Sequence, residues 1–176
     1  MSNLTDLTPG SWTIDPAHSE VAFVARHLMV AKVRGKFTDF TGTITVGDSF
    51  EDSTVQATVK LASVDTGAPD RDAHLRSADF FDVENTPDMT FASTKVSEGS
   101  LDGDLTIKGV TRPVTLDLTF NGVVTDPYGN TKAGFEAETE ISRKEWGLTW
   151  NAALEGGGVV VSDTIKVTVD VELLRA

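Results

Sequence analysis

Apolar and polar residues alternate along most of this chain with a period of two residues. The clearest row runs from Ile165 to Val169, where every second residue is apolar and the residues between are Lys166 and Thr168. This period is typical of strands with one buried and one solvated face, which favours antiparallel pairing. We predict about eight to ten strands from it, over residues 12–15, 20–28, 35–46, 53–64, 88–96, 100–108, 112–124, 131–142 and 158–174, with a further hairpin arm near 145–151.

Short turns separate the rows, notably at 98–99, 108–109 and 126–129, where glycine follows a polar residue or closes an Asp-Pro-Tyr-Gly turn. Residues 121–122, Asn-Gly, fall inside a strand pattern and predict either a bulge or a tight turn. Strands with such even spacing indicate a sandwich or a closed up-and-down barrel.

The best helix candidate lies at 68–76. Pro69 suits a first helical turn, and Asp70 and Asp72 favour the positive end of the helix dipole. Such a short helix needs Leu75 packed against the rest of the protein. One helix is too little to cover a large open sheet, whereas closure hides the inner face and the edges.

The predicted fold class is therefore all-β, an extended antiparallel up-and-down barrel of about eight strands with one short helix. A barrel of this size has room for side chains or for one small ligand. Small inward residues such as Ala25, Ala57 and Ala137 favour a cavity. A filled barrel with a purely structural role stays open as an alternative.

Length, cysteine content and net charge exclude several classes of function. The 176 residues predict a tail at 1–11 and one domain at 12–176. The absence of cysteine excludes disulfides, thiol catalysis and zinc–thiolate sites. The net charge of −12 argues against nucleic-acid binding and against docking on an anionic membrane through a basic patch.

No signal peptide is expected, because the first ten residues lack a positive region followed by an apolar one. The longest apolar run, 21–31, contains Arg26 and His27 and is too short to span a bilayer. We therefore expect a cytoplasmic protein without stable membrane insertion.

Residues 63–93 are the long interruption in the strand pattern, and they place Arg71, Asp72 and His74 close to Phe80 and Phe81. A polar cluster beside an apolar one suits the mouth of a binding cavity. Arginine binds phosphate, carbonyl or hydroxyl groups well, so a polar clamp is one interpretation. The others are a loop held by its own polar pairs, and a catalytic base at His74 oriented by Asp72.

The histidines form no HxH or HExxH pair, so neither a metal site nor a cofactor is expected. His27 continues the inward row of Val21, Phe23 and Ala25, and is either a satisfied polar residue inside the barrel or a contact to a ligand head group. The aromatic residues are either core or cavity wall.

Four segments together resemble the YceI-like family, the polyisoprenoid-binding proteins of bacteria. They lie at 12–37, 63–93, 103–118 and 134–151, and a valine-rich terminal strand follows them. The resemblance covers nearly the whole chain. It implies a lipocalin-like barrel whose long apolar pocket takes an isoprenoid or another long-chain amphiphile, with the head group near the mouth.

We accordingly expect a non-catalytic protein that binds a polyisoprenoid, an isoprenoid quinone or a similar lipid for storage, transport or sequestration. The alternative is a lyase or isomerase acting on a small lipid-like substrate in the same cavity. The apolar loop 28–30 could also pair two copies. The predicted head-group contacts are Arg71, Asp72, His74 and His27. The predicted tail-lining residues are Phe23, Phe37, Phe40, Phe80, Phe81, Phe91, Trp146 and Trp150.

Overall fold

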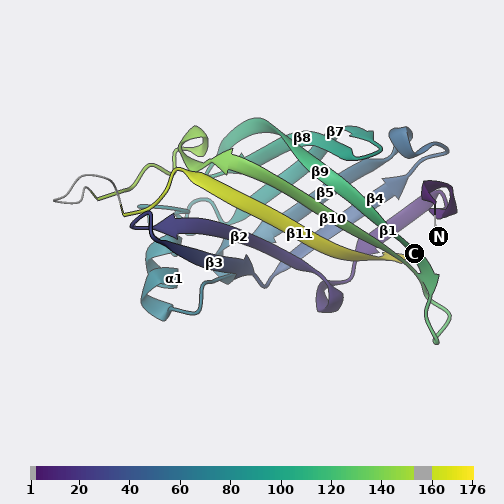
Figure 1. Ribbon diagram of the computed structural model, residues 1–176, viewed down its shortest axis with the longest axis horizontal. Coiled ribbons are helices and arrows are strands. Elements are labelled where there is room, and N and C mark those ends of the chain that lie inside the picture. Colours follow the sequence, from purple (N-terminus) through teal and green to yellow (C-terminus); the bar gives the residue numbers. More distant parts are fainter. Residues whose placement is uncertain (1–2, 153–159) are drawn as a thin grey trace.

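Antiparallel strands pair into one sheet that closes on itself (Figure 1). The computed structural model describes residues 3–152 and 160–176. The strands are β1 (Gly10–Ile14), β2 (Glu20–His27), β3 (Ala31–Phe37), β4 (Phe40–Val46), β5 (Thr54–Lys60), β6 (Val64–Asp65), β7 (Asp88–Ser97), β8 (Ser100–Ile107), β9 (Val110–Thr125), β10 (Thr131–Ser142) and β11 (Thr164–Arg175).

Closure depends on β11, which pairs with β10 along one edge and with two strands, one after the other, along its opposite edge. Its end, Leu173–Arg175, pairs with β1, while Lys166–Asp170 pairs with β2. Strands β1 and β2 therefore act as one strand that bends at the 3-10 turn Pro16–His18. Strands β3 and β4 form the next bent strand, in which β3 pairs with β2 and β4 pairs with β1. In the part of the chain that the structure describes, these segments make the predicted eight-stranded up-and-down barrel, which is confirmed.

The prediction of one strand over 35–46 is wrong, because the backbone breaks between β3 and β4. The hydroxyl of Ser63 accepts hydrogen bonds from the backbone N–H groups of Thr38 and Asp39, each at 3.1 Å. These bonds replace ladder bonds, so the two halves separate. Strand β5 likewise ends at Lys60, before a 3-10 turn and the short β6, and does not continue to residue 64.

The hairpin arm predicted near 145–151 is also wrong. A 3-10 helix, Arg143–Trp146, follows β10 there and ends at Gly147, which has a φ of 76° that glycine adopts without strain. Strand β11 begins at Thr164, so the prediction of a strand over 158–174 is wrong for 160–163, where only an isolated bridge joins Val161 to His27. Residues 158–159 lie outside the described residues.

Alternation along the strands is confirmed. Strand β9 carries a bulge at Asn121, because Gly134 of β10 pairs with Gly122 while Phe135 pairs with Phe120. On either side of the bulge the inward row stays apolar, because Phe120 and Val123 both pack against the core, while Val124 faces outward. Inward residues that line the interior are Val21, Phe23, Ala25, Val55, Ala57, Val59, Leu101, Leu105, Val114, Leu116, Ala137, Thr139, Val167 and Val169.

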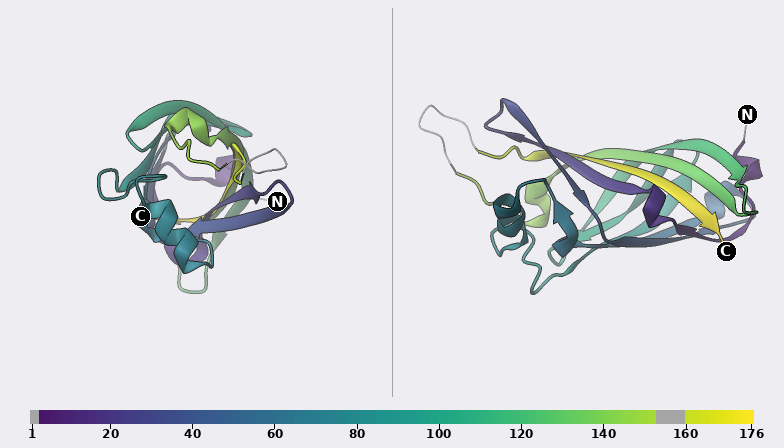
Figure 2. Two further views of the ribbon diagram at one scale, coloured as in Figure 1. Left: turned by 90° about the vertical axis from the view of Figure 1, so that its left-hand side faces the viewer. Right: turned by 90° about the horizontal axis from the view of Figure 1, so that it is seen from below.

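The two barrel ends differ. A buried apolar plug fills the end near the termini and consists of Leu7, Trp12, Val46, Ala133, Phe135 and Leu173. At the other end lies α1 (Pro69–Arg76), where a helix was predicted, with Leu75 packed against the barrel core. The end-on view in Figure 2 (left) shows α1, in teal, at the lower rim of this end. Leu7 belongs to the segment 1–11 that was predicted as a tail.

Candidate ligand-binding site

A cavity of about 260 Å³ lies inside the barrel, between the plug and α1. Its walls are the inward rows of the strands, and Leu75, Phe80 and Phe81 line it at the α1 end. The polar residues among its described lining are three threonines and one arginine, namely Thr41, Thr90, Thr139 and Arg143. An apolar interior with so few polar groups suits a hydrocarbon chain and offers little to a polar ligand.

Two phenylalanine rings are held flat against the wall by glycines on neighbouring strands. A Cβ atom added to Gly35 would lie 2.3 Å from Cζ of Phe23, and one added to Gly103 would lie 2.3 Å from Cζ of Phe91. Both distances are far inside van der Waals contact. The missing side chains therefore let these rings lie along the wall, which keeps the centre of the barrel open.

Replacing Gly103 tests this arrangement. We expect Gly103→Ala to push the Phe91 ring toward the cavity and to lower the free energy of unfolding by about 1–3 kcal/mol, as overpacking does. Gly134→Ala is the matched control, because the Cβ it adds would approach only Asn121, at 3.4 Å. Urea denaturation of both variants measures the difference, and equal losses would contradict the account.

Six of the eight predicted tail-lining residues border the cavity: Phe23, Phe37, Phe40, Phe80, Phe81 and Phe91. The two tryptophans lie behind this lining. Trp146 is buried, and its indole N–H donates to the carbonyl of Leu105 at 2.9 Å. The ring of Trp150 packs against Phe80, with ring centroids 5.4 Å apart. Contact of any of these residues with a ligand stays a prediction.

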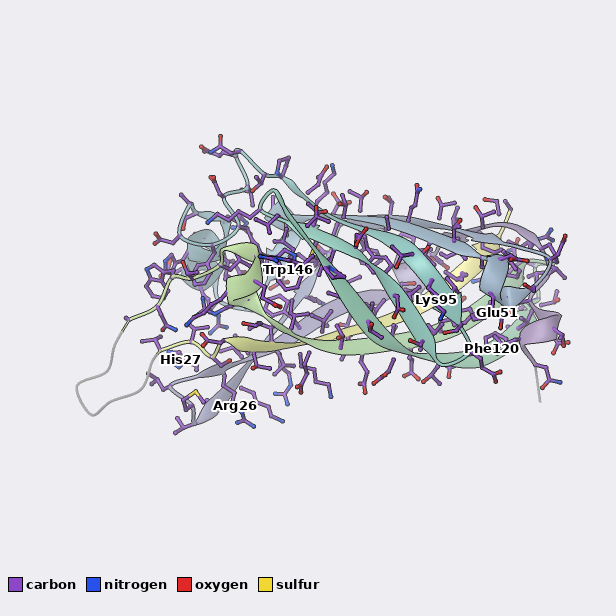
Figure 3. The ribbon with its side chains drawn as sticks, turned by 90° about the horizontal axis from the view of Figure 1, so that it is seen from above. Arg26, His27, Glu51, Lys95, Phe120 and Trp146 are labelled. Carbon is purple, nitrogen blue, oxygen red and sulfur yellow. The ribbon has the colours of Figure 1, made fainter. Side chains whose placement is uncertain are left out.

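Arg143 is the polar residue that the prediction of site residues missed. Its side chain is buried, and its guanidinium donates to the carbonyls of Leu148, Trp150 and Ser162, with a longer bond to Val161. These carbonyls belong to the irregular segment between β10 and β11. Arg143 therefore ties that segment to the barrel wall (Figure 3 labels the neighbouring Trp146).

Groups of the protein itself already occupy most of the hydrogen-bond donors of Arg143. Burial lowers the pKa of Arg143 from its ordinary value, and Asp163, 3.8 Å away, opposes that shift. A guanidinium nevertheless stays protonated in proteins. Four of its five N–H donors meet backbone carbonyls, so it offers little to a bound anion. The alternation of β10 places Arg143 on the inward row of Ala137, Thr139 and Ile141, a signal that could have found it.

Among the predicted head-group residues, Arg71 and Asp72 bond within their own segment. Asp72 is buried and accepts from the backbone N–H of Thr66 at 2.9 Å and from its hydroxyl at 2.6 Å. Arg71 donates to the same hydroxyl at 2.7 Å. Arg76 donates to the carbonyl of Ala62 at 2.9 Å. These are the bonds of a loop held by its own polar pairs, and neither Arg71 nor Asp72 borders the cavity.

His74 lies at the rim, with its ring centroid 5.1 Å from that of Phe80 and 4.5 Å from that of Trp150. Its Nε2 lies 2.9 Å from a carboxylate oxygen of Asp79. The pairing of His74 with Asp72, on which the catalytic alternative rested, is therefore not formed. His74 reaches the cavity only through Phe80, which borders it.

His27 does not follow the inward row as predicted. Strand β2 pairs with β11 as far as Val24 and then with residues 160–162, since Ser162 donates to the carbonyl of Arg26 at 3.0 Å and His27 forms an isolated bridge with Val161. His27 is nevertheless exposed, at the end of the molecule where Figure 3 labels it. The sequence pattern could not show that the inward row ends at Ala25.

Outside the barrel, ligand-type atoms of Asp15, His18 and Glu172 lie within 4.8 Å of one another. The ammonium of Lys132 lies 2.8 Å from Glu172 and 3.5 Å from Asp15. The bond to Glu172 raises the pKa of Lys132, and the bond to His18 lowers the pKa of Asp15. Lys132 thus already supplies a cation to these carboxylates, and the group ties the turn Pro16–His18 to β10 and β11.

Known proteins share this architecture. A family model described as a YceI-like domain matches residues 12–173. A UPF0312 protein of Staphylococcus epidermidis is 39% identical over 164 residues, which cover 92% of this chain and 95% of that protein. Among the described residues, no helix is long and apolar enough to cross a bilayer.

Solved structures of other proteins have the same fold. The Campylobacter jejuni YCEI protein matches with a TM-score of 0.72 and 32% identity, covering 86% of this chain and 90% of that chain. A polyisoprenoid-binding domain from Saccharophagus degradans matches with a TM-score of 0.73 and 16% identity, covering 94% and 98%. The closed barrel, its apolar interior and these matches lead to one conclusion: the chain belongs to the YceI-like family.

Proposed function

We propose that this protein binds a long-chain lipid by enclosing its hydrocarbon tail in the barrel. The observation that carries the proposal is the cavity, whose lining is apolar apart from three threonines and an arginine already occupied by carbonyls. A solved neighbour with the same fold is named as a polyisoprenoid-binding domain, which supports an isoprenoid or isoprenoid quinone as the ligand.

Apolar burial contributes about 0.8 kcal/mol per CH₂ relative to water, so a long tail gains ample free energy on entering the barrel. A bilayer offers the same gain. Selectivity among lipids therefore comes from cavity length and from contacts at the mouth. The cavity of about 260 Å³ is smaller than the roughly 300–1,000 Å³ of pockets that take drug-sized ligands, so a longer tail requires the mouth to open.

We expect the segment 66–84 to move for ligand exchange, because its residues Leu75, Phe80 and Phe81 line the cavity at the α1 end and His74 packs against Phe80. The bond from Arg76 to the carbonyl of Ala62 ties this segment to the 3-10 turn after β5. We place the lipid head group outside the cavity, near His74, Arg71 and Asp72. The interior offers no free charged group, because the guanidinium of Arg143 is occupied by backbone carbonyls, and a buried charge without a partner is strongly unfavourable.

Native mass spectrometry of the protein purified without detergent tests the function. We expect a co-purified lipid, or uptake of added polyprenols, and affinity that rises from geraniol to farnesol and then levels off or falls once the tail exceeds the cavity. The absence of both co-purified lipid and polyprenol uptake would refute lipid binding. Turnover of the added lipid, lost in His74→Ala while binding persists, would favour the enzyme alternative.

A further inference from the structure

The β2–β3 hairpin carries an unusual distribution of charge. Four cations project from it, Arg26, Lys32, Arg34 and Lys36, and all four side chains are exposed. Residues 21–38 contain no Asp or Glu. With a net charge of −12 for the chain and +4 from these residues, the rest of the protein carries −16. The net charge of the whole chain argued against a basic docking patch, but it hides this basic segment because the acidic residues lie elsewhere in the sequence.

Strand register places the four cations on one face of the hairpin. Arg26 pairs directly with Lys32, Arg34 lies opposite Val24, and Lys36 lies opposite Ala22. The other face holds Phe23 and Ala25, which border the cavity. The hairpin therefore has a basic outer face, while its inner face forms part of the cavity wall. Figure 3 labels Arg26 and His27 at this end.

Neighbouring charges leave the patch positive. Lys166 of β11 lies opposite Val24, but it also lies opposite Glu140 and 3.8 Å from Glu138, so it adds no net charge to the four cations. Asp65 of β6 lies opposite Lys36. No ion pair joins Arg26, Lys32 or Arg34 to a carboxylate within 3–152 and 160–176. Like charges directly opposite each other in a hairpin are destabilising, so Arg26 and Lys32 face each other at some cost.

The tip of the hairpin is apolar. Leu28, Met29 and Val30 are 37%, 56% and 81% exposed. Leu28 and Met29 have φ values of 54° and 61°, a backbone conformation that favours Asn and Gly in hairpin turns. Large apolar side chains thus stand exposed in a strained turn, where polar residues would be more stable. Strain of this kind is often retained for function.

We propose that the β2–β3 hairpin docks the protein on an anionic lipid bilayer. The tip would enter the apolar boundary of the bilayer while the basic face meets anionic head groups, the combination that peripheral membrane segments use. Docking would bring the α1 end of the cavity to the source of its lipid (Figure 1). The inference extends the proposed lipid binding but does not depend on what the cavity holds.

Two simpler explanations fit less well. Lysine on an edge strand protects against edge-to-edge pairing, and residues 31–35 of β3 have no strand partner beyond β2 among the described residues. Protection, however, needs no exposed apolar tip. The tip could instead pair two copies, but that would bring two basic faces together. Charge complementarity favours the anionic surface.

Flotation with phosphatidylcholine vesicles that contain phosphatidylglycerol tests the proposal, with pure phosphatidylcholine as reference. We expect binding only to the anionic vesicles and weaker binding at high salt. Arg34→Gln should lower the affinity about fivefold, since each basic residue near the surface contributes about that factor. Lys95→Gln, an exposed cation on β7, should leave the affinity unchanged.

The tip variant separates docking from folding. Leu28→Asn with Met29→Gly supplies residues that suit positive φ, so the melting temperature should stay equal or rise, while vesicle affinity falls at least about tenfold. Tyr128→Ser, at an exposed tyrosine of the β9–β10 hairpin, is the control and should bind normally. Absence of vesicle binding, or full binding by the tip variant, would overturn the proposal.

A concentration-dependent dimer that the tip variant abolishes, without vesicle binding, would assign the tip to a second copy and also overturn the proposal. Lipid binding is scored separately by native mass spectrometry. A protein that carries lipid but ignores vesicles refutes docking alone, whereas one that docks but never holds lipid refutes the proposed function alone.

Discussion

Arg143→Met is expected to lower the free energy of unfolding by about 3–5 kcal/mol, the range seen when one partner of a buried charged group is removed. Methionine keeps much of the side-chain length but makes none of the hydrogen bonds. The carbonyls of Leu148 and Ser162 would then be left without the donor that now satisfies them. Each buried acceptor left unpaired costs about 1–3 kcal/mol.

Urea denaturation of Arg143→Met measures this loss. The neighbouring Lys144→Met is the matched control, because the Lys144 side chain is 53% exposed and pairs with Asp163 at the surface. Such a pair contributes only about 0–1 kcal/mol. Arg143→Lys should recover less than half of the loss, since one ammonium cannot reach carbonyls spread around a planar guanidinium. A loss below 1 kcal/mol for Arg143→Met would contradict the role assigned to it.

Ala137→Phe is expected to weaken lipid binding at least tenfold while leaving the barrel folded. Ala137 is buried and borders the cavity beside Leu116 and Val169. A phenyl ring there would take space that the tail needs. Because the ring enters an existing cavity and not a filled core, the fold should tolerate it better than ordinary overpacking, which costs about 1–3 kcal/mol.

Affinity for farnesol, followed by competition with a fluorescent lipid, gives the measurement. We expect at least a tenfold loss in Ala137→Phe. Ala92→Phe makes the same substitution at an exposed position of β7, where the ring points away from the cavity, and should bind like the unmodified protein. Equal affinities for the two variants would place the lipid elsewhere.

The sequence was sufficient for the barrel and for most of the cavity wall. Period-two alternation depends on local geometry, since successive side chains point to opposite faces of a strand. Phe23, Phe91 and Ala137 could therefore be placed inside from their rows alone. The helix at 68–76 was equally readable, because Pro69 and its acidic neighbours act within one turn.

Structural features that depend on contacts between residues far apart in the sequence could not be predicted. The break after β3 is made by the Ser63 hydroxyl, some two dozen residues along the chain. His27 is exposed although it still forms a bridge with Val161, and the row of Val21, Phe23 and Ala25 does not reveal that it ends at Ala25. His74 pairs with Asp79 and not with Asp72, because helical geometry turns Asp72 toward Thr66.

Arg143 was missed for a different reason. An arginine on an inward row usually marks the end of the row, and its carbonyl partners lie on irregular backbone that has no sequence pattern. The row of β10 nevertheless continues through Ile141 to Arg143 without interruption. Extending the inward row by one more inward residue past Ile141 would have identified Arg143.

Enclosure of a lipid tail by the barrel is tested most directly by crystallography with a farnesol analogue that is brominated at the tail end. We predict an anomalous difference peak inside the barrel, among Ala137, Val169 and Phe91. A fully loaded crystal with the bromine on the outer surface, or with the interior filled by repacked side chains, would contradict the account.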